Sequence, residues 1–335
     1  RPRGMMAVSE FDLIKDYFNK PGLIPTTEQS ARIPLGIGDD CAVLDLPSEK
    51  LLAVSMDTLI ADVHFPAKAD PSLIAQRALA VNLSDLAAMG AEPLAFTLAL
   101  SLPKAEESWL RGFSLGLEKM IQTYHCPLIG GDTTKGPLSI TIQVHGLLDK
   151  GKILTRKGAK PGDFVYVSGA LGAAGLAVSL LSNGMSLEEP DNKKLLLAYY
   201  QPLPRLSLGQ SVAGIASSAI DISDGLMADL GHIALQSSVG IELNTMAIPI
   251  ALAVKKFMST IDDNTKGLKL ALTAGDEYEL VLTVAENKQE EFLENTADLD
   301  VPLTLIGRVV KGSGVKCLDK DGLEIEIKNL GYQHF

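Results

Sequence analysis

The spacing of apolar residues in the first half of the chain predicts helices and strands in mixed order. Phe11, Ile14 and Phe18 fall on one face of a helix. Ser9 can cap the start of that helix, and Pro21-Gly22 would end it. The other apolar runs predict helices over 71–89 and 109–124, and strands over 51–55, 94–100 and 139–144.

The helix over 71–89 carries the clearest boundary signals. Asp70 can serve as its N-cap, and Pro71 suits the first helical position because its missing N–H is not needed there. Gly90 follows the last periodic residue and favours the left-handed turn that ends helices.

The second half of the chain also alternates between strand-like and helical patterns. A glycine-containing turn over 169–175 connects a strand to an apolar helix. The predicted strands cover 164–168, 218–222, 280–284, 303–310 and 324–327, and the predicted helices cover 176–181, 190–204 and 225–237. The first polar stretch after a complete set of elements is 149–152, so we expect domains over 1–150 and 151–335. The fold class is α/β, with two α/β domains of mixed sheets flanked by helices.

Charge and hydropathy exclude two classes of function. The chain of 335 residues has 30 Lys and Arg against 41 Asp and Glu, a net charge of −11, and no basic run exceeds two residues. A nucleic-acid partner is therefore not expected. The longest apolar region, 79–102, is interrupted by Asp85, Glu92 and Pro93, so no membrane span is expected either.

The cysteines give no framework for a disulfide or a zinc site. Cys41, Cys126 and Cys317 are odd in number and far apart in the sequence. This usage fits a reducing compartment, and the sequence predicts a cytoplasmic protein.

Aspartates concentrate where apolar segments end or are interrupted. They occur in five short segments, GIGDD, VSMDT, VNLSDLAAMG, LIGGDTT and AIDISDG. Singly, each could be a turn residue or a helix cap, although Asp85 is harder to explain because aspartate is poor in a helix interior. None of the five segments contains Lys or Arg, so divalent metal is the simplest counter-charge.

The residue types favour magnesium and a phosphate ligand. Oxygen ligands without a cluster of His or Cys suit Mg²⁺ better than zinc or copper. Because Mg²⁺ prefers a few carboxylates together with substrate phosphates, the expected ligand is a nucleotide.

Two glycine-containing segments are candidates for phosphate contact, although the chain contains no Walker motif. The turn over 169–175 fits close packing of helix on strand at least as well as phosphate binding. Gly130-Gly131-Asp132 is more suggestive, since glycines let backbone amides approach an anion. Arg156 is a candidate phosphate clamp, with a solvated surface role as the alternative.

In combination, these segments resemble the thiamine-monophosphate kinase family. The wider superfamily includes aminoimidazole-ribonucleotide synthetase and selenophosphate synthetase. The likeness runs almost end to end, and its specific part is the order and separation of GIGDD, VNLSDLAAMGA, LIGGDTT, SAIDISDGL and DEYEL. The resemblance implies two α/β domains, a sheet of the N-terminal domain that pairs into a barrel across a homodimer, and a C-terminal domain that completes the ATP and substrate site.

The resemblance also implies an activity and a set of site residues. The expected reaction moves the γ-phosphoryl group of ATP to thiamine phosphate, with several Mg²⁺ ions. The family's metal positions fall on Asp40, Ser55, Met56, Asp57, Asp85, Asp132, Asp221 and Asp224. Its ATP contacts fall on Gly131, Asp132, Arg156 and Ser223, and its thiamine-side contacts fall on His64, Asp276 and Tyr332. As ordinary residues, His64 would be a surface or packing histidine and Tyr332 a core aromatic.

Two positions depart from the family pattern. Met56 stands where the family often has threonine, so only its main-chain carbonyl could be a ligand. Asp276-Glu277 stands where the family usually has Glu-Asp, so either acid could face the substrate.

The chemistry of the acceptor explains a site rich in aspartate. A phosphate monoester has a second pKa of about 6, so its attacking oxygen is already ionised at neutral pH and no general base is required. We therefore expect direct in-line transfer without a phosphoenzyme. The alternatives are another ATP-dependent synthetase of the superfamily and a non-enzymatic Mg²⁺ or nucleotide sensor. Selenophosphate synthesis is disfavoured because no cysteine precedes Cys41.

Overall fold

The computed structural model describes residues 10–261, 264–327 and 331. The described residues divide into two compact units, the first formed by residues 10–83 and 93–147 and the second by residues 84–92, 148–261, 264–327 and 331. One helix, α2 (Pro71–Met89), contributes residues to both units. Among the described residues, no helix combines the length and the apolar character that crossing a membrane requires.

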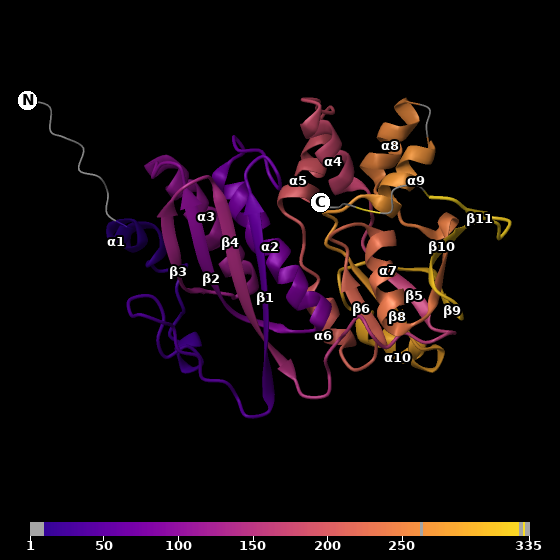
Figure 1. Ribbon diagram of the computed structural model, residues 1–335, viewed down its shortest axis with the longest axis horizontal. Helices are drawn as coiled ribbons and strands as arrows, with labels where there is room; N and C mark the ends of the chain where they lie inside the picture. The colour runs from indigo at the N-terminus through magenta and orange to yellow at the C-terminus, as the bar shows by residue number, and fades with distance from the viewer. Residues whose placement is uncertain (1–9, 262–263, 328–330, 332–335) are drawn as a thin grey trace, which may run out of the picture. The chain divides into compact units, whose positions relative to one another are not determined.

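The first unit contains a four-stranded sheet with the strand order β1-β4-β2-β3 (Figure 1). Its strands are β1 (Lys50–Ile60), β2 (Glu92–Leu102), β3 (Leu128–Lys135) and β4 (Ser139–Asp149). Strand β2 pairs with β3 in parallel, with Ala99 opposite Asp132. The helices are α1 (Glu10–Leu13), continued by a π-helical stretch (Ile14–Phe18), then α2 and α3 (Glu107–Tyr124).

The start and end of α2 follow the signals in its sequence. The Oδ1 atom of Asp70 accepts the amide hydrogen of Ser72 at 2.7 Å, and the helix begins at Pro71. Gly90 follows the helix with a φ of 74°, so the expected glycine stop is confirmed. Helices α2 and α3 approach closely at Gly116, where an added Cβ would lie 2.3 Å from the carbonyl oxygen of Ser72.

The second unit contains a seven-stranded sheet with the order β11-β10-β7-β9-β5-β8-β6. Its strands are β5 (Phe164–Ser168), β6 (Ser218–Asp221), β7 (Gly240–Asn244), β8 (Leu280–Val284), β9 (Leu303–Val310), β10 (Gly314–Leu318) and β11 (Glu324–Ile325). Strands β10 and β7 are parallel, and the other neighbours are antiparallel. The helices are α4 (Ala173–Ser182), α5 (Asp191–Tyr200), α6 (Leu206–Val212), α7 (Leu226–Ser237), α8 (Leu252–Thr260), α9 (Asn264–Thr273) and α10 (Gln289–Thr296).

Helix α7 packs on the seven-stranded sheet and fixes the core of the second unit. Leu226, Leu230 and Ile233 are fully buried in one cluster with Val167 of β5 and Val281 of β8. The spacing of these helix residues is the helical periodicity expected for an apolar face. The N-terminus of α7 is thereby held beside the end of β6, where two of the aspartates lie.

The observed elements match the expected mixed α/β class, with helices flanking both sheets. The main difference in the first half is β3, because LIGGDTTK forms a full strand where no element was predicted. The first helix is also shorter than expected and continues as the π-helical stretch; Ser9 lies outside the described residues. The elements not predicted in the second half are α6, α8, α9, α10, β7 and β10.

Candidate functional site

The first unit has a pocket of about 780 Å³ that brings three of the predicted site residues together. Asp40, Gly131 and Asp132 line it, with Asp39, Cys41 and Lys15 also on the wall. Asp40 comes from the loop before β1, whereas Gly131 and Asp132 belong to β3. Acidic groups and exposed backbone therefore face one space, which suits a phosphate accompanied by a cation.

Two local features give this pocket its shape. The segment that carries Asp40 is anchored on both sides, since Ile33 is buried against Ile129 and Leu94, and Leu44 packs on the same cluster. Gly131 has a φ of 149°, and a Cβ at this position would lie 1.8 Å from the carbonyl oxygen of Leu98. Only glycine fits so close to the neighbouring strand, so this approach fixes the backbone directly before Asp132.

The predicted metal positions on β1 do not line this pocket. The amide of Asp57 donates to the Oδ1 atom of Asn82 at 3.0 Å, which ties the strand to α2. Ser55 and Asp57 lie on one face of the strand, and the Met56 side chain lies on the other face, 60% exposed. A methionine thioether is a poor ligand for Mg²⁺, so Met56 could contribute only its carbonyl oxygen.

His64 lies just after β1 and its ring is held by the backbone. The Nδ1 atom accepts the amide hydrogen of Ile60 at 3.0 Å, so the neutral ring carries its proton on Nε2. The Nε atom of Arg77 donates to the carbonyl oxygen of His64 at 3.1 Å. The imidazole is thus fixed in orientation. His64 is not among the residues that line the pocket described above.

In the second unit, Asp221 is the centre of a group of predicted site residues. Its side chain is 4% exposed at the end of β6, and the hydroxyl of Ser84 donates to its Oδ2 atom at 2.7 Å. The pKa of Asp221 is raised to about 7: burial and then the negative charge of Asp85 raise it, while the Ser84 hydrogen bond and the charge of Arg156 partly offset that rise. Two carboxylates whose negative charges repel each other at a buried position are suited to binding a divalent ion.

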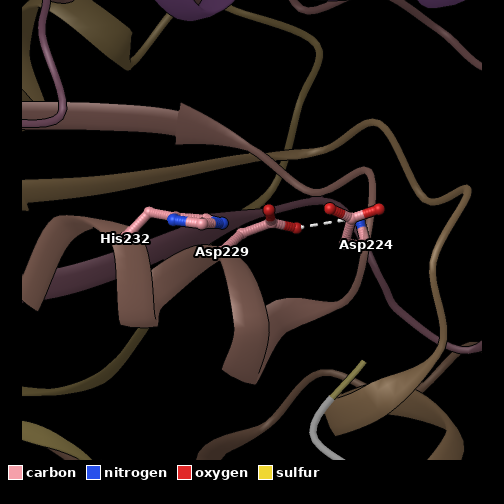
Figure 2. Close-up of side chains that lie close together, drawn as sticks. All are labelled: Asp224, Asp229 and His232. Atoms are coloured by element: carbon pink, nitrogen blue, oxygen red, sulfur yellow. Dashed lines mark hydrogen bonds between the residues drawn. The ribbon is translucent and has the colours of Figure 1, made fainter. Parts of the chain in front are cut away.

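The turn between β6 and α7 carries Ser223 and Asp224, both predicted site residues. Its backbone is organised by Asp229, a residue that the sequence analysis did not single out. The Oδ2 atom of Asp229 accepts the amide hydrogens of Ser223, Asp224 and Gly225 at 3.1, 3.0 and 3.1 Å. Figure 2 shows the Asp229 carboxylate between Asp224 and the ring of His232. Ligand atoms of these three side chains lie within 4.8 Å of one another.

The segment that contains Asp276 lies against this turn. The amide of Asp276 donates to the carbonyl oxygen of Ser223 at 2.9 Å. Gly275 makes the approach possible, because a Cβ there would lie 2.4 Å from the same oxygen. Asp276 and Tyr278 have left-handed φ values of 65° and 52°, a conformation that costs energy for residues other than glycine. The structure therefore brings Asp276 next to the Ser223–Asp224 backbone.

Glu277 points away from this turn and toward α4. Its Oε1 atom accepts the amide hydrogen of Gly172 at 2.9 Å, and Gly175 also donates to the carboxyl group. Burial raises the pKa of Glu277 to about 8. The amides of the glycine turn are thus occupied by a side chain, and an added Cβ at Gly175 would lie 2.3 Å from the Cβ of Ala274. The close-packing interpretation of this turn fits these contacts.

The structure brings some of the predicted residues together in two groups, one in each unit. Asp40, Gly131 and Asp132 meet in the pocket of the first unit. Asp85, Arg156 and Asp221 interact electrostatically in the second unit. Tyr332 lies outside the described residues. Gly331, directly before it, is close to the turn, since a Cβ on Gly331 would lie 2.8 Å from the carbonyl oxygen of Asp224.

Comparison with known proteins identifies the family. Residues 38–148 match the model of the AIR synthase related protein, N-terminal domain, and residues 160–320 match that of the corresponding C-terminal domain. Thiamine-monophosphate kinase of Escherichia coli is 41% identical over 331 residues, which are 98% of this chain and 99% of that protein. The chain belongs to the thiamine-monophosphate kinase family.

Solved structures of thiamine-monophosphate kinases have the same fold. The enzyme from Stenotrophomonas maltophilia superimposes with a TM-score of 0.83 at 38% identity, covering 96% of this chain and 99% of that one. A structure of AaThiL complexed with AMPPCP and TMP gives a TM-score of 0.77 at 30% identity, covering 89% and 92%. The two-sheet α/β architecture is therefore that of thiamine-monophosphate kinases.

Proposed function

We propose that the protein transfers the γ-phosphoryl group of ATP to thiamine phosphate and forms thiamine diphosphate and ADP. The observation that carries this proposal is the 41% identity to a thiamine-monophosphate kinase over 98% of the chain. The complex of AaThiL with AMPPCP and TMP supports the pair of substrates. The aspartates described above supply carboxylates that can bind the Mg²⁺ ions of such a reaction.

We propose that several Mg²⁺ ions bind to the acidic positions. The first unit would contribute Asp40, Ser55, the carbonyl of Met56, Asp57 and Asp132, and the second Asp85, Asp221 and Asp224. Two observations support Mg²⁺ at these positions. The residues offer oxygen atoms as ligands, and the pKa of Asp221 is raised first by burial and then by the charge of Asp85. Bound Mg²⁺ would neutralise phosphate charge and hold phosphoryl oxygens in place.

The remaining predicted residues are proposed to hold the two substrates. For ATP these are Gly131, Asp132, Arg156 and Ser223, and for thiamine phosphate they are His64, Asp276 and Tyr332. For Gly131, the absence of a side chain next to the pocket supports a contact through the backbone. For Asp276, its position beside Ser223 favours it over Glu277, whose carboxyl group is engaged at Gly172.

In this proposal the protein orients its substrates and no side chain acts as a general base. The acceptor phosphate ionises with a pKa of about 6, so its oxygen can attack without losing a proton to the protein. The attacking oxygen forms a bond to the γ-phosphorus as the bond to the β-γ bridging oxygen breaks, and ADP leaves with that electron pair. Incubation with γ-labelled ATP alone should leave the protein unlabelled; a labelled adduct would contradict direct transfer.

A homodimer is also proposed, with the four-stranded sheet at its interface. Strand β1 is at the edge of this sheet, and its alternate residues Val54, Met56 and Ile60 are 51, 60 and 41% exposed. An exposed apolar row on an edge strand favours pairing with another sheet. Light scattering in solution tests whether the protein is a dimer.

We further propose a cytoplasmic protein with two domains, over 1–150 and 151–335. The matched ranges 38–148 and 160–320 support this division into domains.

A single assay tests the proposed function. The protein is incubated with ATP, MgCl₂ and thiamine phosphate, and thiamine diphosphate and ADP are quantified by chromatography. Equal amounts of the two products are expected, with none from thiamine or without Mg²⁺. ATP hydrolysis without thiamine diphosphate would favour another ATP-dependent reaction of the superfamily. Binding of ATP without any turnover would favour a sensor.

A further inference from the structure

Asp229 stands out among the buried acids because of what one of its oxygens binds. The side chain is 2% exposed, and its Oδ2 atom accepts three consecutive amide hydrogens, from Ser223, Asp224 and Gly225. Asp229 lies in the first turn of α7, so the carboxylate reaches back over the start of its own helix. The amides at a helix start have no partner within the helix, so a side-chain oxygen that accepts their hydrogen bonds satisfies donors that would otherwise be unpaired.

The three hydrogen bonds give one oxygen of Asp229 a role different from that of the proposed metal ligands. A carboxylate oxygen has two lone pairs, and Oδ2 already accepts three N–H groups, so that atom is not available to a cation. Asp229 therefore acts on the backbone of the turn. That turn carries Ser223 and Asp224, and Figure 2 shows Asp224 directly beyond the bonded oxygen.

We propose that Asp229 is a positioning residue. By accepting hydrogen bonds from the three amides it fixes the turn, and it thereby places the Asp224 carboxylate for metal binding and Ser223 for ATP binding. The consequence for metal and ATP binding rests on the proposed function, whereas the effect of Asp229 on the turn can be measured without turnover. Without the Asp229 acceptor, three N–H groups lose their shared partner, and among the described residues no other side chain accepts a hydrogen bond from these amides.

The test compares Asp229→Ala with a matched control, Asp163→Ala. Asp163 is 4% exposed in the same unit and also accepts a backbone amide, that of Lys160 at 3.0 Å, together with the hydroxyl of Ser217. Its partners lie outside the turn, so its loss should lower stability without moving Asp224. Asp229→Asn is the conservative variant, because an amide oxygen can take the place of Oδ2.

Two measurements are made on each full-length variant in the absence of thiamine phosphate. Hydrogen exchange of the peptide that covers residues 222–226 should accelerate about tenfold or more in Asp229→Ala and stay unchanged in Asp163→Ala. Mn²⁺ binding, followed by electron paramagnetic resonance with Mn²⁺ as the probe, should weaken about tenfold in Asp229→Ala. Asp229→Asn should stay within about threefold of wild type in both measurements.

Several results would overturn the proposal. Unchanged exchange or unchanged Mn²⁺ binding in Asp229→Ala would do so, as would an equal effect in Asp163→Ala. If Asp229→Asn behaved like the alanine variant, charge rather than the hydrogen bonds would be responsible. If Asp229→Ala does not fold, Asp229→Ser is measured instead, since its hydroxyl is one atom too short. Absence of thiamine diphosphate formation by wild type would refute the proposed function and leave these two measurements decisive for Asp229.

Discussion

The carboxyl group of Glu277 and the amide of Gly172 are joined by a hydrogen bond of 2.9 Å at the start of helix α4. Asp276, the preceding residue, instead lies beside Ser223, and the hydroxyl of Tyr278 donates to its Oδ1 atom at 3.3 Å. Two acids that are neighbours in the sequence therefore have different surroundings. One is enclosed by the glycine turn, and the other is close to the turn that carries Asp224.

This difference predicts separate effects for the two acids. Asp276→Asn should raise the KM for thiamine phosphate about tenfold and leave the melting temperature close to that of wild type, because it removes charge without changing size. Glu277→Ala should lower the free energy of unfolding by about 1 kcal/mol, as loss of a helix cap does, with little change in KM. Steady-state kinetics and thermal unfolding measure both. An increase in KM confined to Glu277→Ala would assign the substrate contact to Glu277 instead.

Glu277 also predicts a pH dependence of stability. Its pKa is raised from 4.5 to about 8 by burial, so the folded state keeps a proton that the unfolded state releases. Its contribution to stability is complete below pH 4.5 and is lost as pH rises to about 8. For one proton the steepest loss is about 1.4 kcal/mol per pH unit. Urea unfolding of wild type and Glu277→Gln across this range should show curves that converge or cross; parallel curves would contradict the prediction.

Loss of charge at the proposed metal positions should abolish most activity. Asp85→Asn and Asp132→Asn should each lower kcat/KM about a hundredfold or more while the fold remains intact, because they remove cation ligands rather than packing. Asp319→Asn is the control, since this carboxylate binds the amides of Asp321 and Leu323 in a surface turn. The thiamine diphosphate assay and circular dichroism are the measurements. Retained activity in both site variants would remove these residues from the site.

Two adjacent glycines in β3 should respond differently to alanine. An added Cβ at Gly131 would lie 1.8 Å from the carbonyl oxygen of Leu98, whereas at Gly130 the nearest atom is 3.7 Å away. Gly131→Ala should therefore cost about 2 kcal/mol or more of stability and disturb the pocket at Asp132. Gly130→Ala should change stability by less than about 1 kcal/mol. Denaturant unfolding of both variants is the check, and equal effects would refute the close approach.

The sequence was sufficient to predict the elements with strong local signals. Helix α2 has a cap at Asp70, proline at its first position and glycine after its end, and all three act locally. Strand β4 alternates buried and partly exposed residues, as a half-buried strand should. Strand β3 was missed because glycine and aspartate are poor strand formers, and pairing with β2 overrides that preference.

The candidate site was predicted as residue types but not as contacts. The aspartates near Ser84 could be singled out from their apolar surroundings, yet the hydrogen bond from Ser84 to Asp221 joins residues 137 positions apart. Asp229 was missed although it follows the Ser-Asp-Gly turn at a spacing of one helical turn. Acids are favoured in the first turn of a helix, where the backbone amides have no partner within the helix, and this position was the available signal. The positions of Asp276 and Glu277 depended on left-handed backbone angles that the sequence does not reveal.

Residues 84–92, the end of α2 and the turn after it, group with a unit whose other residues begin at 148. There the carbonyl oxygen of Ala87 lies so close to Gly209 that a Cβ on the glycine would be 2.0 Å away, and the amide of Leu154 donates to the carbonyl of Met89. A polypeptide cut near residue 150 would leave this short segment in one fragment and its neighbours in the other. For protein engineering, the two halves are therefore not exchangeable modules, and a chimera needs a junction that keeps 84–92 together with its partners.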